Sequence, residues 1–170
     1  NIAGSYQEKA YHYIIDQTRE KSGKTKAGLP NFDNMDAFGY TMLQKPLQAL
    51  NMVYPNKLFD EDHKIDSKIL LGTEGLRKTM KFTETTNPPT RKNFEYKPSQ
   101  YGNIFAPDKI GQYSSKIKGI TTHIMKSTGI VLIYSQFIDG GLIPMALALE
   151  EMGMTRYGTK ASNLFKVPPP

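Results

Sequence analysis

Hydrophobic residues at helical spacing predict two helices in the first 60 residues of the chain. The first spans residues 5–21 and starts with a Ser-x-x-Glu capping box at Ser5. Its apolar and aromatic face consists of Tyr6, Ala10, Tyr13, Ile14 and Gln17. The second helix is expected to begin near Pro46, because proline suits a first helical turn, and to end before Pro55. Its predicted inward residues are Leu47, Leu50 and Val53.

The periodic pattern weakens over residues 61–112. A short helix is predicted over residues 73–82, with Thr73 as its N-cap and with Leu76 and Met80 on one side. Residues 83–113 hold four prolines and several aromatic residues with little periodicity. Such a stretch is typical of a long irregular excursion. We therefore expect residues 61–112 to form an insertion of largely irregular structure.

Helical spacing returns at Ser114, where serines cap a predicted helix that ends at Gly129. The apolar residues of this helix are Ile117, Ile120, Ile124 and Met125. Residues 130–134 then form a continuous apolar run rich in β-branched residues, which is typical of a parallel strand buried on both faces. Because one strand cannot close a sheet, we expect the domain to continue beyond residue 170 or in another chain.

The glycines at 140 and 141 are predicted to form a turn between this strand and a further helix. Pro144 loses no helical hydrogen bond only in the first turn, so the helix must start near Gly141 or later. Its apolar positions are Leu142, Met145, Ala146, Leu149 and Met152. Helix, strand and helix in this order predict an α/β fold.

Composition narrows the class of protein. The 170 residues include no cysteine, which excludes disulfides and thiolate metal sites and fits the cytosol or nucleus. No apolar run approaches the roughly 20 residues that cross a bilayer, and no signal peptide is visible, so no membrane partner is expected. The formal charge of +6 is compatible with nucleic-acid binding. Because the chain does not start with methionine, we expect it to be cut from a longer protein.

No motif for self-contained catalysis is found. Residues 22–25, Ser-Gly-Lys-Thr, match only the end of a phosphate-binding loop, because Thr18 stands where that motif needs glycine and a helix precedes. The three histidines, His12, His63 and His123, lack the spacing of metal ligands. Glu150 and Glu151 are interpreted as part of a solvated helix face. We therefore assign no catalytic residue, no metal site and no cofactor to this chain.

Two patterns are candidates for contact with nucleic acid. Residues 90–97 interleave basic and aromatic side chains, as in proteins that bind single strands, although anchoring of a loop by its aromatics is the favoured interpretation. Ser135 and Gln136 lie at the carboxyl end of the predicted strand, where open α/β sheets bind ligands. Small residues there would allow a sugar-phosphate backbone to approach closely. A plain strand-to-helix turn explains the same residues equally well.

Residues 113–153 resemble the opening of the second RecA-like domain of Swi/Snf-type superfamily-2 helicases. The resemblance rests on the order Ser-x-Lys-Ile at Ser114 to Ile117, followed by Val-Leu-Ile-Tyr-Ser-Gln-Phe at Val131 to Phe137. The sequence of residues 135–153 is most similar to helicases of large eukaryotic DNA viruses, including relatives of poxvirus transcription NTPases. Residues 1–60 resemble the helical segment between the two motor lobes, whereas residues 61–112 show no resemblance.

The resemblance implies an α/β, partial RecA-like C-terminal lobe of P-loop type, with a helical N-terminal segment and a long irregular insertion. Its divisions are an inter-lobe segment at 1–60, the insertion at 61–112 and the incomplete second lobe at 113–170. It implies a fragment of an ATP-dependent helicase or translocase, inactive alone, whose parent hydrolyses NTP. The residues that would contact a nucleic-acid backbone are Lys116, Ser135, Gln136, Gly140 and Gly141.

The resemblance also sets expectations for the parent. DNA or RNA and the remaining helicase lobes are its implied partners, and ATP with magnesium is expected there. The implied location is the cytoplasm or nucleus of an infected host, or the virion. The Walker loop, the Asp-Glu box and the later second-lobe motifs are absent from this sequence. A nucleic-acid-binding or scaffold module without a motor is the alternative, and an unrelated α/β nucleotide-binding enzyme lacks the Gly-rich turn it would need.

Overall fold

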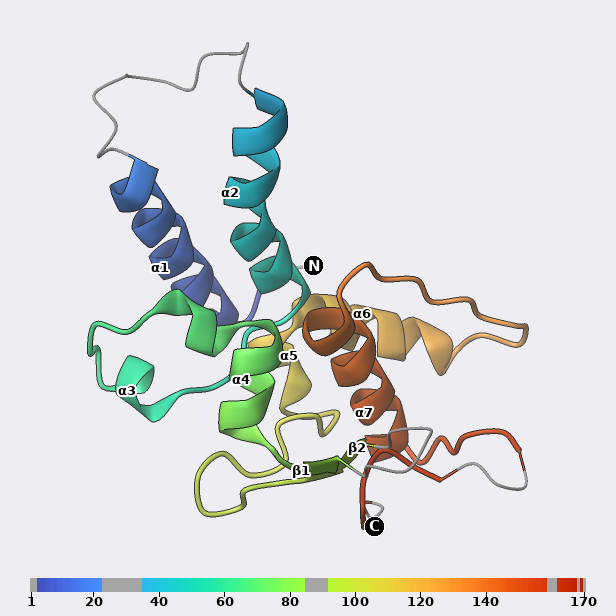
Figure 1. Ribbon diagram of the computed structural model, residues 1–170. Helices are drawn as coiled ribbons and strands as arrows, with labels where there is room; N and C mark the ends of the chain where they lie inside the picture. The colour runs from blue at the N-terminus through green and yellow to red at the C-terminus, as the bar shows by residue number, and fades with distance from the viewer. Residues whose placement is uncertain (1–2, 23–34, 85–91, 159–161, 168, 170) are drawn as a thin grey trace.

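The computed structural model describes residues 3–22, 35–84, 92–158, 162–167 and 169. Two long helices, α1 (Ser5–Ser22) and α2 (Met35–Asn51), lie side by side at one end of the molecule and run in opposite directions (Figure 1). Helix α1 confirms the helix predicted over residues 5–21. Ala10 and Ile14 from its predicted inner face are fully buried.

Helix α2 starts earlier than predicted. It begins at Met35 and runs through Pro46, so the start expected near that proline is wrong. Two of its predicted inward residues, Leu47 and Leu50, are 40% and 46% exposed. The third, Val53, is fully buried as predicted, although it follows the end of the helix. Within α2 the buried positions are Pro46 and Ala49, so the proline lies on the packed face and the apolar stripe of the helix is rotated from the predicted one.

Three short elements follow α2, and the first two of them pack against α1. They are α3 (Lys57–Asp60), the 3-10 helix η2 (Ser67–Leu70) and α4 (Gly72–Thr79). Polar side chains of α1 hold the connection between α3 and η2, because the Tyr13 hydroxyl both donates to the carbonyl of Ile65 (2.7 Å) and accepts from its amide (2.9 Å). One hydrophobic cluster results, consisting of Ala10, Ile14, Ala49, Val53, Phe59, Ile65, Leu70 and Leu71.

Helix α4 confirms the short helix predicted over residues 73–82, with Leu76 and Met80 buried. Its N-cap is Leu71, without a side-chain cap, so Thr73 does not serve as predicted. Gly75 allows this helix to lie directly on the Tyr54 ring, because a Cβ at that position would be 2.4 Å from the ring. Helix α4 is thereby fixed against the chain segment that leaves α2.

The stretch expected to be irregular contains a hairpin. Strand β1 (Lys81–Glu84) pairs antiparallel with β2 (Lys92–Glu95), with Phe82 opposite Phe94. A segment near the C-terminus lies beside β2, since Phe165 forms a parallel bridge with Phe94. The Phe94 amide donates to the carbonyl of Leu164 (2.7 Å) and the Lys166 amide donates to the carbonyl of Phe94 (3.0 Å). Phe94 is thus buried, which agrees with the favoured interpretation that the aromatics of residues 90–97 anchor this segment, but it lies in a strand and not in a loop.

The remaining helices complete a second hydrophobic cluster. They are α5 (Ile110–Tyr113), α6 (Ser115–Ile124), a π-helical turn η3 (Ile138–Leu142) and α7 (Ile143–Glu151). Ser114 caps α6 as predicted, because its hydroxyl accepts from the Ile117 amide at 2.9 Å. Helix α6 nevertheless ends at Ile124, before the predicted Gly129.

The second cluster draws on all three predicted divisions of the chain. Met52 comes from residues 1–60, Leu76 from residues 61–112 and Ile117 from residues 113–170. Ile104, Phe105 and Ile110, within the predicted excursion, are also fully buried or nearly so. The described parts of the three divisions therefore share one packed core.

The predicted strand over residues 130–134 is not formed. These residues adopt no regular structure, and Ile130, Leu132 and Tyr134 are 104%, 93% and 88% exposed. A buried parallel strand needs a paired strand on each edge and cover on each face, and no described strand pairs with this segment. The broader prediction of an α/β, partial RecA-like lobe stays a prediction. In the described residues, no helix is both long and apolar enough to cross a membrane.

Glu150 of α7 fastens the segment that pairs with β2. Its buried carboxylate accepts hydrogen bonds from the amides of Leu164 (2.6 Å) and Phe165 (2.9 Å). We expect Glu150→Ala to lower the free energy of unfolding by about 3 kcal/mol, because two buried amides lose their acceptor. Urea denaturation measures this loss.

Glu150→Gln keeps one oxygen as an acceptor and should lose less than Glu150→Ala. The control is Glu20→Ala, which removes an exposed carboxylate from α1 and should change the free energy of unfolding little. Equal losses in Glu150→Ala and Glu20→Ala would contradict the assigned role of Glu150.

Candidate functional site

The predicted turn at Gly140 and Gly141 is a π-helical turn that leads into α7. The Leu142 amide donates to the carbonyl of Phe137 at 3.0 Å, five residues back, and the Ile143 amide likewise donates to that of Ile138. Helix α7 starts at Ile143 with Pro144 in its first turn, which confirms the start predicted at or after Gly141. Turns of this kind are rare and frequently occur at functional sites.

Two hydroxyl groups hold this turn from distant parts of the chain. The Tyr54 hydroxyl donates to the backbone carbonyl of Asp139 (2.5 Å), and the Thr73 hydroxyl donates to the Asp139 carboxylate (2.7 Å). Gly140 is buried, and a Cβ there would lie 3.6 Å from the Cα of Gly72 and 3.5 Å from the Gln48 side chain. The turn is therefore fixed against α4 and α2.

Ser135 closes the other side of the turn. Its hydroxyl accepts from the Phe137 amide at 3.1 Å. The same oxygen lies so near Gly141 that an added Cβ would be 2.3 Å from it. The structure thus brings together three of the predicted site residues, Ser135, Gly140 and Gly141, and it uses the serine hydroxyl to shape the backbone.

Gln136 and Lys116, the other two predicted residues, are exposed. Gln136 lies between Ser135 and Phe137, directly before the turn. Lys116 lies on α6, where its ammonium donates to the Asn51 side-chain carbonyl at 2.6 Å. No hydrogen bond or ion pair in the described residues joins Lys116 to the turn.

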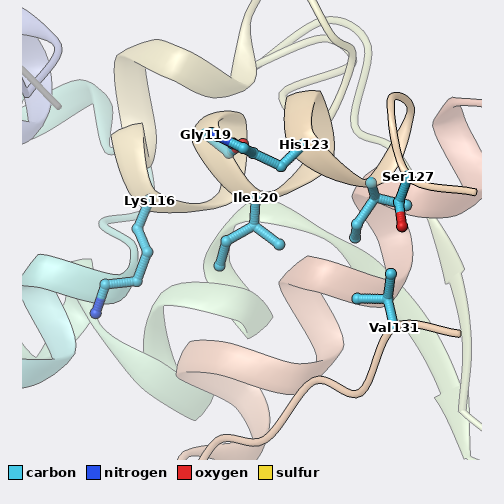
Figure 2. A pocket seen from close by; sticks show the side chains of 7 residues that line it. Lys116, Gly119, Ile120, His123, Ser127 and Val131 are labelled. Carbon is cyan, nitrogen blue, oxygen red and sulfur yellow. The ribbon is translucent and has the colours of Figure 1, made fainter. Parts of the chain in front are cut away.

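Lys116 also borders an open pocket of about 480 Å³ between α6 and the segment that follows it. Figure 2 shows the side chains that surround it, which include Lys116, Ile120 and His123 from α6 and Ser127 and Val131 from the next segment. The Nδ1 atom of His123 is 2.7 Å from the carbonyl of Gly119, within its own helix. The pocket combines an apolar floor with a cationic edge. Among the described residues, no group of three His, Asp or Glu side chains could hold a metal ion.

The segment that precedes Asp139 of the turn carries positive charge without carboxylates. Residues 109–138 contain four lysines and neither aspartate nor glutamate. These lysines are Lys109, Lys116, Lys118 and Lys126. A scan for stretches without carboxylates finds this run in the sequence, although the overall charge alone does not. No sequence pattern identifies Tyr54 and Thr73 as residues of this site, since they lie 85 and 66 residues from Asp139.

No family model, no curated protein and no solved structure matches this chain. The arrangement of its own residues is therefore the basis for any functional conclusion.

Burial raises the pKa of the Tyr54 hydroxyl well above 10, and the Asp139 carboxylate raises it further. The native state thus keeps a proton that the unfolded chain loses above pH about 10. The corresponding stability is fully present below that pH and is lost as the pH rises toward the native pKa. We expect the free energy of unfolding to fall as the pH rises above about 10, and to fall less steeply in Tyr54→Phe.

Urea denaturation across this pH range provides the measurement. At neutral pH Tyr54→Phe should cost about 1 kcal/mol, because the Asp139 carbonyl loses its donor. Tyr157→Phe, at a fully exposed tyrosine, is the matched control. If Tyr54→Phe shows the pH dependence of the unchanged chain, Tyr54 does not hold the turn through a protonated hydroxyl.

Proposed function

We propose that this chain is part of an ATP-dependent nucleic-acid motor of the Swi/Snf-type superfamily 2, and that residues 113–153 belong to its second RecA-like lobe. One observation carries the proposal: residues 109–138 contain four lysines and no carboxylate, and they lead directly into a fixed, glycine-containing turn. Phosphate backbones are recognised by such cations and by closely approached backbone. The assignment to a motor protein rests on the resemblance of residues 113–153 to Swi/Snf-type helicases.

The exposed apolar run over residues 130–134 supports the same proposal. Ile130 and Leu132 leave nearly their whole side chains in solvent, which folded proteins rarely allow for contiguous apolar residues without a partner. Neighbouring strands of a RecA-like lobe would cover this run. Helix α6 precedes this run in the sequence and α7 follows it. The two helices pack against each other, which is compatible with a helix–strand–helix unit.

In this proposal ATP and magnesium bind other parts of the parent protein. They would need a complete phosphate-binding loop and an acidic pair that follows a buried strand. The phosphate-binding motif of this sequence is incomplete, and Asp60 and Glu61 lie at the end of the short helix α3 instead of a strand. Residues 23–25 of the partial Ser-Gly-Lys-Thr match lie outside the described residues. The chain's own residues would contribute backbone contacts through Lys116, Gln136 and the turn.

We expect this chain to bind single-stranded DNA, and Lys116→Ala combined with Gln136→Ala to weaken that binding roughly fivefold at low salt. The physical reason is the loss of one cation and one amide donor from the proposed backbone contact. Fluorescence anisotropy of a labelled oligothymidine measures the affinity. The slope of log affinity against log salt should fall by about 0.7 for the lost phosphate contact.

The matched control is Lys57→Ala combined with Gln100→Ala, which removes the same charge and the same amide from exposed positions elsewhere. This control should bind almost as the unchanged chain does. If both double variants lose affinity equally, net charge alone governs binding and residues 116 and 136 form no site.

We also expect no ATP hydrolysis by this chain, with or without DNA, because it lacks the motifs that hold the triphosphate. A coupled phosphate-release assay measures turnover. If the purified chain hydrolyses ATP and a substitution in this chain abolishes that hydrolysis, the assignment of catalysis to other parts of the parent is contradicted.

A nucleic-acid-binding module without a motor is the second candidate, and the lysine run without NTP motifs favours it. The two candidates are distinguished by the sequence of the parent reading frame. A motor requires a Walker loop upstream and an arginine-finger helix downstream, whereas the module requires neither.

A further inference from the structure

A second group of cations lies where α4 ends and β1 begins, apart from Lys116, Gln136 and the π-helical turn. The Lys97 ammonium donates to the carbonyls of Lys78 (2.7 Å) and Arg77 (3.2 Å) in the last turn of α4. Helix C-termini carry free carbonyls and partial negative charge, so one lysine in this position has a structural explanation. The structure places three more cations around it.

These cations crowd one another. Burial lowers the pKa of Lys97, and the charges of Lys78 and Lys81 lower it further, which shows that all three ammonium groups lie within electrostatic reach. The guanidinium of Arg77 lies over the Phe82 ring, 5.8 Å from its centre. Together, Arg77, Lys78, Lys81 and Lys97 form what we call the α4–β1 basic patch. Like charges this close destabilise the chain in isolation.

Carboxylates balance only part of the charge of this patch. Glu95 stands opposite Lys81 in the hairpin, and Glu74 precedes Lys78 by four residues in α4. Glu95 forms an ion pair with Lys166 at 2.7 Å, so a further cation accompanies it. In the described part of the chain, no ion pair joins any patch residue to a carboxylate. The excess positive charge therefore remains available to an external anion.

The patch and the turn at Asp139 lie at opposite ends of the same helix. Thr73, in the first turn of α4, donates to Asp139, while Arg77 and Lys78 lie in its last turn. Helix α4 has eight residues and is therefore about 12 Å long. Figure 1 shows this helix between the end of α2 and the hairpin. A ligand with several regularly spaced phosphates is able to reach both ends.

We propose that the α4–β1 basic patch is a second contact for the phosphate backbone of a nucleic acid, separate from Lys116 and Gln136. The inference depends on the nucleic-acid partner of the proposed function but not on a motor. Its partner is a polyphosphate chain because a polymer releases a counterion at each phosphate that the patch contacts, whereas a single phosphate gains only one such contact. The patch thus extends the bound strand along α4.

The test is the double variant Lys78→Gln with Lys81→Gln, which keeps the capping Lys97 and the stacked Arg77 in place. Anisotropy of labelled oligothymidine should show roughly fivefold weaker binding at low salt and a salt slope smaller by about 1.4, for two lost phosphate contacts. Lys57→Gln with Lys64→Gln is the control, since it removes the same two charges from exposed positions around α3. Urea denaturation of each variant verifies that the fold is retained.

The outcomes separate this inference from the proposed function. Weaker binding in the patch variant than in its control supports the patch, whatever the Lys116 and Gln136 variant does. Equal binding in the patch variant and the control overturns the patch, and leaves the proposed function standing if the Lys116 and Gln136 variant is impaired. Binding of phosphatidylserine vesicles that depends on Lys78 and Lys81, without binding of DNA, overturns the patch as a nucleic-acid contact.

Discussion

The arrangement of this molecule depends on one buried tyrosine. The backbone amide of Tyr54 donates to the carbonyl of Leu70 at 2.8 Å, and its own carbonyl accepts from the Tyr6 hydroxyl at 3.4 Å. Its ring fills the space that Gly75 leaves free, and its hydroxyl donates to the backbone of Asp139. One side chain and its backbone thereby link α1, η2, α4 and the π-helical turn. Because its ring is fully buried, none of these contacts is replaceable by water.

This constraint explains how an unusual turn is held without a sheet beneath it. In an α/β fold, the end of a strand normally positions the residues that follow it. Here the residues before the turn are exposed and unpaired, and the turn is held instead by the hydroxyls of Tyr54 and Thr73 and by contact with Gly72. The geometry of the glycines is thus independent of the apolar run at 130–134. That independence allows the turn to keep one shape whether or not the run is covered.

Local patterns were sufficient for elements whose stability is local. The first helix, the Ser114 cap and the Pro144 limit on α7 follow from spacing and capping chemistry, and all three are found. Elements that depend on distant partners were not predictable. Phe94 is buried because Phe82 and Phe165 lie beside it, and neither neighbour is apparent from the sequence near Phe94. The opposite error arose at residues 130–134, where strong β preference predicted a strand but pairing partners are required to form one.

The same reasoning applies to the candidate site. The sequence placed Ser135, Gly140 and Gly141 together because they are close along the chain, and the structure agrees. The residues that support them come from α4 and the end of α2, and contact with them is set by the fold alone. The total charge is visible in the sequence, whereas the grouping of cations in the folded chain is not. The grouping of Lys97 with the end of α4 requires the hairpin to bring residues 78 and 97 together.

The parallel bridge between Phe94 and Phe165 has a consequence for synthesis of the chain. Leu164 and Phe165 complete the cluster that contains Met52 and Leu76, so this core cannot close until residue 165 has left the ribosome. Contacts between residues so distant in the chain form slowly, because a long loop must first be ordered. Helices α1 and α2 are already available by then, whereas the hairpin waits with one edge open. Strand β2 therefore stays accessible from the emergence of residue 95 until that of residue 165, and chaperones that bind extended apolar segments have an opportunity there.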